Sequence, residues 1–358
     1  AVVENLLFHS EKLEEPNPQI YVFLDQHHDD EKVAELAHKP CFLIGGRWFR
    51  ADQVYRGGNS LSPLRATLPD EIQKFPALLK ALNVLDEPYP RDGITVLQEI
   101  EEHHRDTYPS QTKELEPALW EAWRLIEAGL ASGVLEPDQV HKKLNSRAVV
   151  PYRDDTLGEP RQTFFEDLPD MVSKFPPEVG NKVIAPRHGT VSALRAAGVR
   201  GLFTASEIEV DGGEPEVGPG AELASQLGEM REPILRVAGY ILGGELAASA
   251  AENFDDLRVV ARPDLKSRLR LKHGRLAVEY TQWTPSDVAF ERKTKSIYQS
   301  TSAEAFDECE LARQISLVLA GEAAEAAELI SLLAHVFSSG DGERAQTKLD
   351  GLAIPRMT

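Results

Sequence analysis

The stretch Cys41-Phe42-Leu43-Ile44-Gly45-Gly46-Arg47-Trp48-Phe49 decides how the fold is interpreted, because a related pattern occurs a second time along the chain. Two short apolar runs that flank a Gly-Gly pair predict a β-hairpin. A proline-containing connection and a Leu/Ala-rich helix follow, and this helix ends at Asn83-Val84. The second copy begins at Ala148-Val149-Val150-Pro151, passes through Phe164-Phe165 and ends in a similar helix at Gly198-Val199. The repetition indicates two hairpin-and-helix units and favours an architectural chain over a site that is built once.

The two copies occupy the first of two expected parts. Residues 1–210 form the duplicated region, and residues 211–222 are rich in Gly, Pro and Glu without an apolar period, which predicts a linker. The alternative is a surface loop inside one domain. Residues 223–358 predict an apolar helix over 233–251, an antiparallel meander of about five strands between 258 and 299, and C-terminal helices packed with it. The expected fold class is therefore α+β and helix-rich.

Several shorter patterns predict individual elements. The sequence Gln-Ile-Tyr-Val-Phe-Leu at residues 19–24 is typical of a strand. Asp70 is expected to cap a helix that carries Leu78, Leu79 and Leu82. The strongest helical pattern lies at residues 114–129. The large aromatic side chains stand in apolar contexts, so we expect core positions for Trp48, Trp120, Trp123, Phe164, Phe165 and Trp283.

Composition narrows the class of protein. The chain has 358 residues and a formal net charge of −19, which disfavours binding to a phosphate backbone by the chain as a whole. Two cysteines, Cys41 and Cys309, are too few for a disulfide framework or a thiolate zinc site. No run approaches the roughly 18 apolar residues of a membrane-spanning helix. We therefore expect a cytoplasmic protein that makes no membrane contact.

Motifs that carry chemistry are missing or weak. Neither a phosphate-binding glycine loop nor a nucleophile elbow occurs. Cys309 lies between Glu308 and Glu310, and neighbouring carboxylates disfavour a reactive thiolate. Glu99 and His103 are four residues apart on an expected helix and could face one metal ion, but the ordinary interpretation is an ion pair on a solvated helix face. The sequence predicts no catalytic residue, cofactor or metal site, while a metal-dependent hydrolase around Glu99 and His103 stays as a third hypothesis.

A basic strand is the best candidate for a binding surface. In residues 265–272 leucines alternate with cations, which places the cations on one face of a strand. Three interpretations stay open: a strand face paired with acidic residues of the same chain, a docking site for an acidic partner domain, and a nucleic-acid site. The candidate residues are Arg258, Arg262, Lys266, Arg268, Arg270, Lys272 and Arg275.

These patterns resemble a known family. The run Phe42-Leu43-Ile44-Gly45-Gly46-Arg47-Trp48-Phe49-Arg50-Ala51-Asp52-Gln53-Val54, with Leu68-Pro69-Asp70-Glu71, Phe75-Pro76-Ala77-Leu78-Leu79 and Leu82-Asn83-Val84, resembles the region after the ATPase domain of sacsin-like proteins. The second half is similar to the segment after those repeats, also met in large bacterial ATP-binding proteins and plant NO VEIN-type proteins. The residues that carry this are Leu257-Arg258-Val259-Val260, the basic strand, Phe290-Glu291-Arg292-Lys293, Ile297-Tyr298 and the helix over 309–319.

The resemblance implies a GHKL-type nucleotide-binding domain upstream in the same parent protein, and a chaperone-like or defence-associated role for the whole. This chain has none of that domain's glycine motifs, so ATP binding is carried over to no residue here. We expect a non-catalytic scaffold that contacts the upstream domain and possible protein clients. The alternative is a nucleic-acid-binding module of a prokaryotic defence protein that uses the basic strand.

Overall fold

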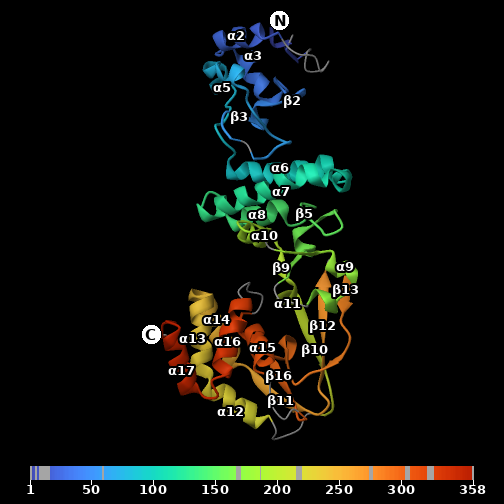
Figure 1. The fold of residues 1–358 in the computed structure, drawn as a ribbon, viewed down its shortest axis with the longest axis vertical. Coiled ribbons are helices and arrows are strands. Elements are labelled where there is room, and N and C mark those ends of the chain that lie inside the picture. Colours follow the sequence, from blue (N-terminus) through green and yellow to red (C-terminus); the bar gives the residue numbers. More distant parts are fainter. Residues whose placement is uncertain are drawn as a thin grey trace. The chain divides into compact units, whose positions relative to one another are not determined.

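The chain folds as a helix-rich α+β protein, which confirms the expected fold class (Figure 1). The computed structural model describes residues 2–4, 6–7, 17–58, 60–166, 171–185, 187–214, 220–273, 277–302, 307–320 and 326–356. The chain forms two compact units. Unit 1 comprises residues 1–160 and 186–198, and unit 2 comprises residues 161–185 and 199–358.

The first copy of the repeat begins with the expected hairpin. Strands β1 (Phe42–Ile44) and β2 (Arg47–Phe49) pair antiparallel, and Gly45 and Gly46 between them have φ of 57° and 79°. A turn with two positive φ angles matches the twist of a hairpin and favours glycine. The 3-10 helix η2 (Ala51–Gln53) then leads to β3 (Val54–Tyr55), which pairs parallel with β4 (Ala66–Thr67). A parallel bridge joins Tyr55 to Leu85 on the other side, after the helix α5 (Pro76–Ala81).

The second copy repeats the hairpin, the 3-10 helix, the parallel strands and the final helix in this order, with η4 (Val172–Lys174) and α9 (Pro177–Gly180) inserted between the first two parallel strands. Strands β5 (Val150–Pro151) and β6 (Leu157–Gly158) pair antiparallel, and η3 (Pro160–Gln162) leads to β7 (Phe164–Phe165). Strand β7 pairs parallel with β8 (Val183–Ile184) and with β9 (Arg200–Gly201), and the helix α10 (Val191–Ala197) lies between these two in the chain. The helices α5 and α10 are each followed by a residue of positive φ, Asn83 at 54° and Gly198 at 116°. The duplication read from the sequence is therefore a duplication of topology.

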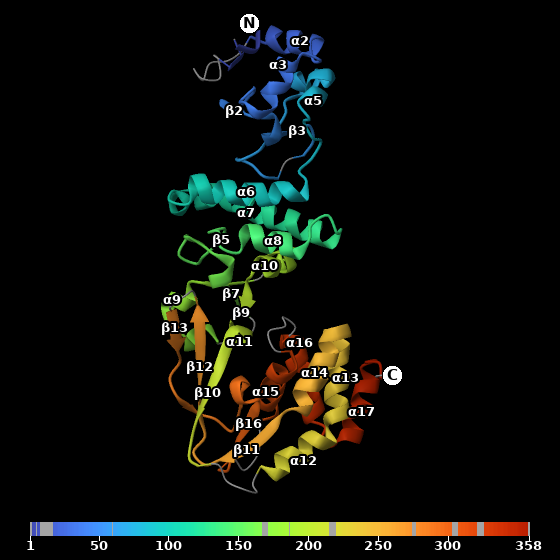
Figure 2. The same cartoon turned by 180° about the vertical axis from the view of Figure 1, so that it is seen from behind.

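Three helices of unit 1 lie in the chain between the first copy and the start of the second: α6 (Pro90–His104), α7 (Tyr108–Ala131) and α8 (Pro137–Leu144). Helices α6 and α7 lie side by side (Figures 1 and 2). Leu115, Leu119, Trp123 and Ile126 line the buried face of α7, and none of them is more than 2% exposed. The expected helical pattern at residues 114–129 is therefore confirmed, within a longer helix.

Two expectations for unit 1 were wrong. Residues 19–24 belong to the helix α2 (Gln19–Gln26) and not to a strand, because Ile20, Tyr21 and Leu24 are buried together on one helical face. Their β-branched and aromatic composition is overridden by this packing. Asp70 does not cap the helix of Leu78, since it begins a separate helix, α4 (Asp70–Gln73). The cap of α5 comes from α2, where Asp25 accepts a hydrogen bond of 2.8 Å from the Leu78 amide.

Unit 2 contains the expected strands, distributed over two larger sheets. In one sheet β10 (Ser206–Asp211), β12 (Lys266–His273) and β13 (Ala277–Tyr280) run antiparallel in that order, and β14 (Thr284–Pro285) also pairs with β12. In the other, β16 (Ser296–Ser300) lies between β11 (Arg258–Arg262) and β15 (Val288–Glu291). The pairing of β11 with β16 is parallel. The expected single antiparallel meander is therefore wrong. Strand β10 precedes the expected meander in the chain and pairs with the basic strand β12, and β16 lies at the centre of a separate sheet.

Helices pack beside these sheets. They are α12 (Ala221–Glu229), α13 (Arg231–Leu242), α14 (Gly244–Asp255), α15 (Glu308–Ala320), α16 (Ala326–Phe337) and α17 (Gly342–Gly351). Helix α13 packs against α14, α16 and α17 (Figures 1 and 2). The single helix expected over 233–251 is divided in two, since Gly243 and Gly244 both have positive φ, which ends α13. The buried core of this part includes Ile234, Ile315, Leu319 and Leu333.

The expected linker at residues 211–222 lies inside unit 2. Strand β10 directly before it pairs with β12, so residues 206–211 join the sheet of the second half. The Gly213 amide donates a hydrogen bond of 3.0 Å to Pro263, which fixes the first residues of the stretch against the same sheet. Residues 215–219 lie outside the described part of the chain.

Candidate functional site

The basic strand faces an acidic strand of its own chain. Arg268 on β12 donates two hydrogen bonds, of 2.8 and 2.6 Å, to Glu209 on the neighbouring strand β10. Arg270 donates one hydrogen bond to Glu207. The strand register places Lys266 opposite Asp211. The alternating cations of β12 therefore meet alternating acids of β10, as in the first of the three interpretations.

The seven candidate cations do not form one surface. Arg258 and Arg262 lie on β11, which belongs to the other sheet of unit 2. The Arg262 guanidinium lies over the ring of Tyr298, 4.9 Å from its centroid. Lys272 is exposed on β12, and Arg275 lies outside the described residues. Lys266, Arg268, Arg270 and Lys272 share the strand β12, and Arg258 and Arg262 share β11.

A β-bulge lies opposite Arg268. Arg270 pairs with Tyr280 and Ser267 with Thr284, so the second strand holds one residue more than β12 between these pairs. Residues three apart in a regular strand point to opposite faces, and one extra residue brings Tyr280 and Trp283 to the same face. The Arg268 guanidinium carbon lies 4.3 Å from the centroid of the Tyr280 ring and 4.5 Å from that of the Trp283 ring. Trp283 is 39% exposed, so the expectation that it is a core residue was wrong.

The other large aromatic residues that were expected in the core differ in how deeply they are buried. Trp120, Trp123, Phe164 and Phe165 are buried, as expected. Trp48 is half-buried beside the core of the first copy.

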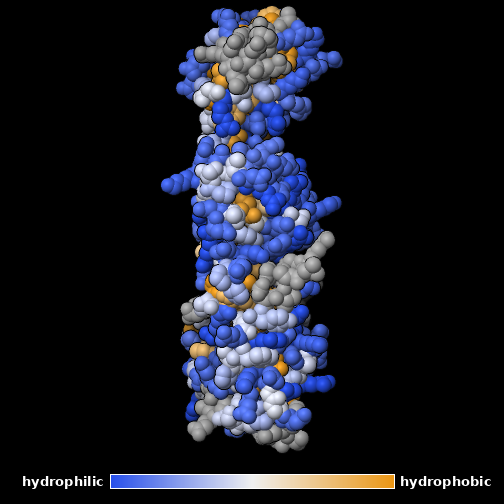
Figure 3. Space-filling model, turned by 90° about the vertical axis from the view of Figure 1, so that its right-hand side faces the viewer, coloured by the Kyte–Doolittle hydropathy of each residue, from blue (hydrophilic) through white to orange (hydrophobic). Residues whose placement is uncertain are grey.

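The face drawn in Figure 3 is mostly hydrophilic, and hydrophobic residues reach it in small separate patches.

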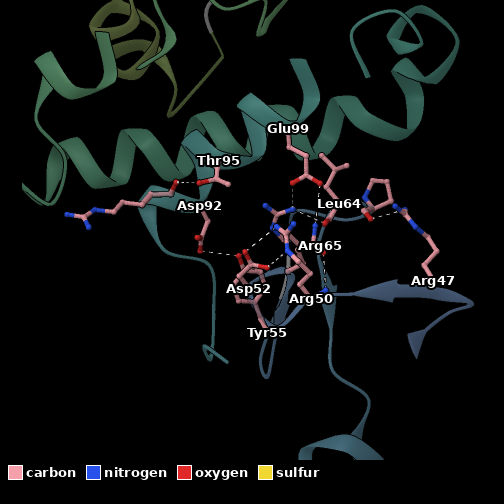
Figure 4. A network of polar contacts seen from close by, with 12 residues as sticks. Arg47, Arg50, Asp52, Tyr55, Leu64, Arg65, Asp92, Thr95 and Glu99 are labelled. Atoms are coloured by element: carbon pink, nitrogen blue, oxygen red, sulfur yellow. Dashed lines mark hydrogen bonds and ion pairs between the residues drawn. The ribbon is translucent and has the colours of Figure 1, made fainter. Parts of the chain in front are cut away.

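A buried ion pair joins the first copy to α6. Arg65, whose side chain is 2% exposed, donates a hydrogen bond of 2.7 Å to Glu99 on α6 (Figure 4). The same guanidinium nitrogen donates to the Leu64 carbonyl at 2.9 Å. Gln53 approaches the other Glu99 oxygen at 3.5 Å. Because a charge in such a setting is costly unless it is paired, Arg65 ties its loop to α6.

A second contact supports this junction at the start of α6. The Tyr55 hydroxyl donates a hydrogen bond of 3.0 Å to Asp92 (Figure 4). The Tyr89 amide donates one of 2.7 Å to the same Asp92 oxygen. Burial, with the neighbouring charge of Asp92, raises the pKa of Tyr55, so the hydroxyl remains a donor. Asp92 therefore caps α6 and binds β3 with one carboxylate.

The second copy is attached to α6 through Glu101, two residues after Glu99. Glu101 accepts 2.7 and 3.1 Å hydrogen bonds from the Arg147 guanidinium and the Ala148 amide, directly before β5. Glu102 accepts a further bond of 3.0 Å from Arg147. The bond to Glu101, more than that to Glu102, raises the pKa of Arg147. Helix α6 thus carries two acids, Glu99 and Glu101, that bind the two copies separately.

Glu99 and His103 are joined by no third metal-binding side chain among the residues that the structure describes. Glu99 is occupied by Arg65 and Gln53. No group of three or more metal-binding side chains occurs within the described ranges. Both cysteines are free, with Cys41 buried and Cys309 exposed. The structure also has, in the residues described, no helix long and apolar enough to cross a membrane.

Sequence reasoning missed the residues that join the copies to α6. Arg65, Asp92, Glu101 and Arg147 follow no catalytic or ligand-binding motif. The available signals were a single arginine in the apolar run Leu64-Arg65-Ala66 and the acidic cluster Glu99-Ile100-Glu101-Glu102 on a helix with a buried face.

Comparisons with known proteins identify no relative. No protein-family model matches the chain, no curated protein matches it, and no solved structure matches it. The contacts of the described residues are therefore the basis for a functional proposal.

Proposed function

We propose that this chain is a non-catalytic scaffold and coupling region of a large sacsin-like ATPase, and that it acts through domain and partner contacts. The observation that carries the proposal is the double attachment of α6. Arg65 of the first copy binds Glu99, and Arg147 at the start of the second copy binds Glu101. A displacement of one copy would therefore reach the other through one rigid helix.

The resemblance to sacsin-like proteins supports the part of the proposal that concerns an upstream ATPase domain. An upstream nucleotide-binding domain of the parent protein would hydrolyse ATP, and the packed repeats would relay its change of state. Hydrogen-bonded side chains on a rigid helix can carry such coupling when the elements they join have two arrangements. The parent protein would work in the cytoplasm as a chaperone-like or defence-associated factor.

The alternative, a nucleic-acid-binding module, has weaker support. It depends on cations that reach phosphate groups, and Arg268 and Arg270 are already paired with Glu209 and Glu207. A nucleic acid would have to displace these acids from the same sheet, on a chain with a net charge of −19. We therefore place the scaffold first.

Hydrogen exchange of the full-length parent protein tests the coupling. We expect amide exchange in both copies to differ between the ATP-bound and ADP-bound states. Replacing Arg147 by Met removes the attachment to Glu101, so the nucleotide-dependent difference should persist around Arg65 and vanish after residue 148. Replacing Arg124 by Met is the matched control, because its pair with Glu121 joins residues of the same helix.

Two results would contradict the scaffold role. One is micromolar binding of Mg-ATP to this chain alone in isothermal titration calorimetry. The other is a parent reading frame without a nucleotide-binding domain upstream.

A further inference from the structure

Unit 2 contains a cavity of about 450 Å³ that the proposed function does not use. It lies between the segment η4 (Val172–Lys174), the bulged part of the β12 sheet and the first turns of α15. This volume is within the range of roughly 300–1,000 Å³ typical of small-molecule sites. Its lining includes Lys174, Ser267, Leu269, Thr281, Arg313 and Gln314.

The lining is positively charged although the chain is acidic. Lys174, Arg268 and Arg313 contribute cations, and Glu310 is the single acid among the described residues that line the cavity. Glu310 is already engaged, since it accepts a hydrogen bond of 3.3 Å from Arg313 and one of 2.6 Å from Gln314. Lys174 has no acid within ion-pair distance among the described residues. Arg268 is paired with Glu209 and Arg313 with Glu310, so Lys174 is the lining cation without an acid partner among the described residues.

The β-bulge adds hydrogen-bond donors to this cavity. The Leu269 amide donates to the Thr281 hydroxyl at 2.8 Å, so the side chain replaces a main-chain acceptor of the ladder. After Thr281, the amide of Gln282 donates no hydrogen bond to any described residue. Gln282 is one of the lining residues, and a main-chain amide without an acceptor is a suitable donor for an anion.

The rest of the lining is apolar. Met171 is 4% exposed and Ile208 is 7% exposed, and both belong to the buried cluster below the cavity. Leu269 packs against the same cluster. A ligand with a charged group and an apolar body would match both parts of the lining.

We propose that this cavity binds a small organic anion. Its carboxylate or phosphate group is held by Lys174 and Arg313, with the Gln282 amide as a further donor, and its apolar part lies against Met171, Ile208 and Leu269. The site is independent of the scaffold role, because it lies in unit 2 and shares no residue with the attachment of α6.

Binding of 8-anilinonaphthalene-1-sulfonate to the full chain tests the site, since this probe combines an anionic group with an apolar body. We expect one probe molecule per chain with enhanced fluorescence. Replacing Lys174 by Glu, or Arg313 by Gln, should weaken binding about 10-fold, because each change removes a charge-assisted contact. Replacing Lys266 by Glu is the control, since Lys266 lies on the same strand β12 but is exposed and does not line the cavity.

Competition then distinguishes the two anionic groups. Displacement of the probe by phenyl phosphate or by benzoate supports the site and identifies the preferred group, while benzyl alcohol should not compete. The proposal is overturned if neither anion displaces the probe, or if Lys174→Glu and Arg313→Gln both bind it with the affinity of the original chain. A thermal melt of each variant checks that it is folded, and Lys174→Gln, at an exposed position, provides a milder version of the same test.

Discussion

Arg65 donates a hydrogen bond of 2.7 Å to Glu99, and this pair joins a loop of the first copy to α6 with an arginine side chain that is only 2% exposed. The pair therefore belongs to the interior of unit 1, where a charge that loses its partner has little access to water. Its energetic effect should differ strongly from that of the surface ion pairs of the same unit.

Replacing Arg65 by Met should destabilise unit 1 by about 3 kcal/mol, because Glu99 loses its main partner in a partly buried position. Replacing Arg56 by Met, which breaks an exposed pair with Asp86, should cost about 1 kcal/mol or less. Urea unfolding followed by tryptophan fluorescence measures both, in a Trp283→Phe background that leaves only the tryptophans of unit 1. Equal losses for the two variants would refute the structural importance of the buried pair.

A second prediction concerns the close approach of α6 and α7. A Cβ atom added at Gly93 would lie 2.5 Å from the Ala122 carbonyl oxygen, so Gly93→Ala must separate the helices. We expect a net loss of about 1–2 kcal/mol, since overpacking outweighs the gain in helix propensity. Gly228 in α12 has no atom within 4 Å of such a Cβ, and Gly228→Ala should instead stabilise by about 0.5–1 kcal/mol. Thermal melts of both variants test this; the same sign for both would contradict it.

The two thiols should differ in reactivity. Cys41 is 1% exposed, and burial, together with the nearby charge of Asp52, raises its pKa, whereas Cys309 is exposed. Because the thiolate is the reactive form, a disulfide reagent such as Ellman's reagent should label one thiol in the native chain and a second only after denaturation. The variant Cys309→Ser should show no rapid labelling. Rapid labelling of that variant would show that the first copy opens far more readily than its packing implies.

Some parts of the fold could be predicted from the sequence because their signals are local. The hairpin of the first copy depends on Gly45-Gly46 and its flanking apolar runs, and the helix α7 on a regular apolar pattern. Residues 19–24 misled us because their composition favours a strand, while the face formed by Ile20, Tyr21 and Leu24 becomes apparent only in the packed core.

Other parts depend on contacts between distant residues. The parallel pairing of β11 with β16 joins residues 258–262 to residues 296–300, and no local pattern specifies it. The pairing of β10 with β12 had a readable signal, because Glu207, Glu209 and Asp211 alternate as the cations of β12 do. Considering the two alternations together would have predicted that the basic strand is neutralised within the chain.

That neutralisation gives a fourth prediction. The original chain should pass through a DNA-cellulose column at low salt, and the double variant Glu207→Gln/Glu209→Gln should be retained, because Arg268 and Arg270 lose their partners. Two freed cations should steepen the slope of log affinity against log salt by about 2. Adding Arg268→Gln and Arg270→Gln to this variant should abolish retention. Strong retention of the original chain would instead favour the nucleic-acid function.

The last prediction concerns acid sensitivity. Asp350 on α17 accepts hydrogen bonds of 2.6 Å from Arg356 and 2.7 Å from Arg236, and these lower its pKa to about 2. An unfolded aspartate has a pKa of about 3.9. The folded chain therefore binds this proton less readily than the unfolded chain, so the stabilisation is complete above about pH 4 and is lost as the pH falls towards 2.

The variant Asp350→Asn isolates this contribution. Its free energy of unfolding should be lower than that of the original chain at pH 7, and the difference should shrink between pH 4 and pH 2, because the original carboxylate becomes protonated in that interval. Urea unfolding at several pH values, followed by circular dichroism, measures the difference. Asp256→Asn serves as the control, since Asp256 pairs with Lys295 where both side chains are more than half exposed. A difference between Asp350→Asn and the original chain that stays constant from pH 4 to pH 2 would show that Arg236 and Arg356 do not hold this carboxylate in its charged form.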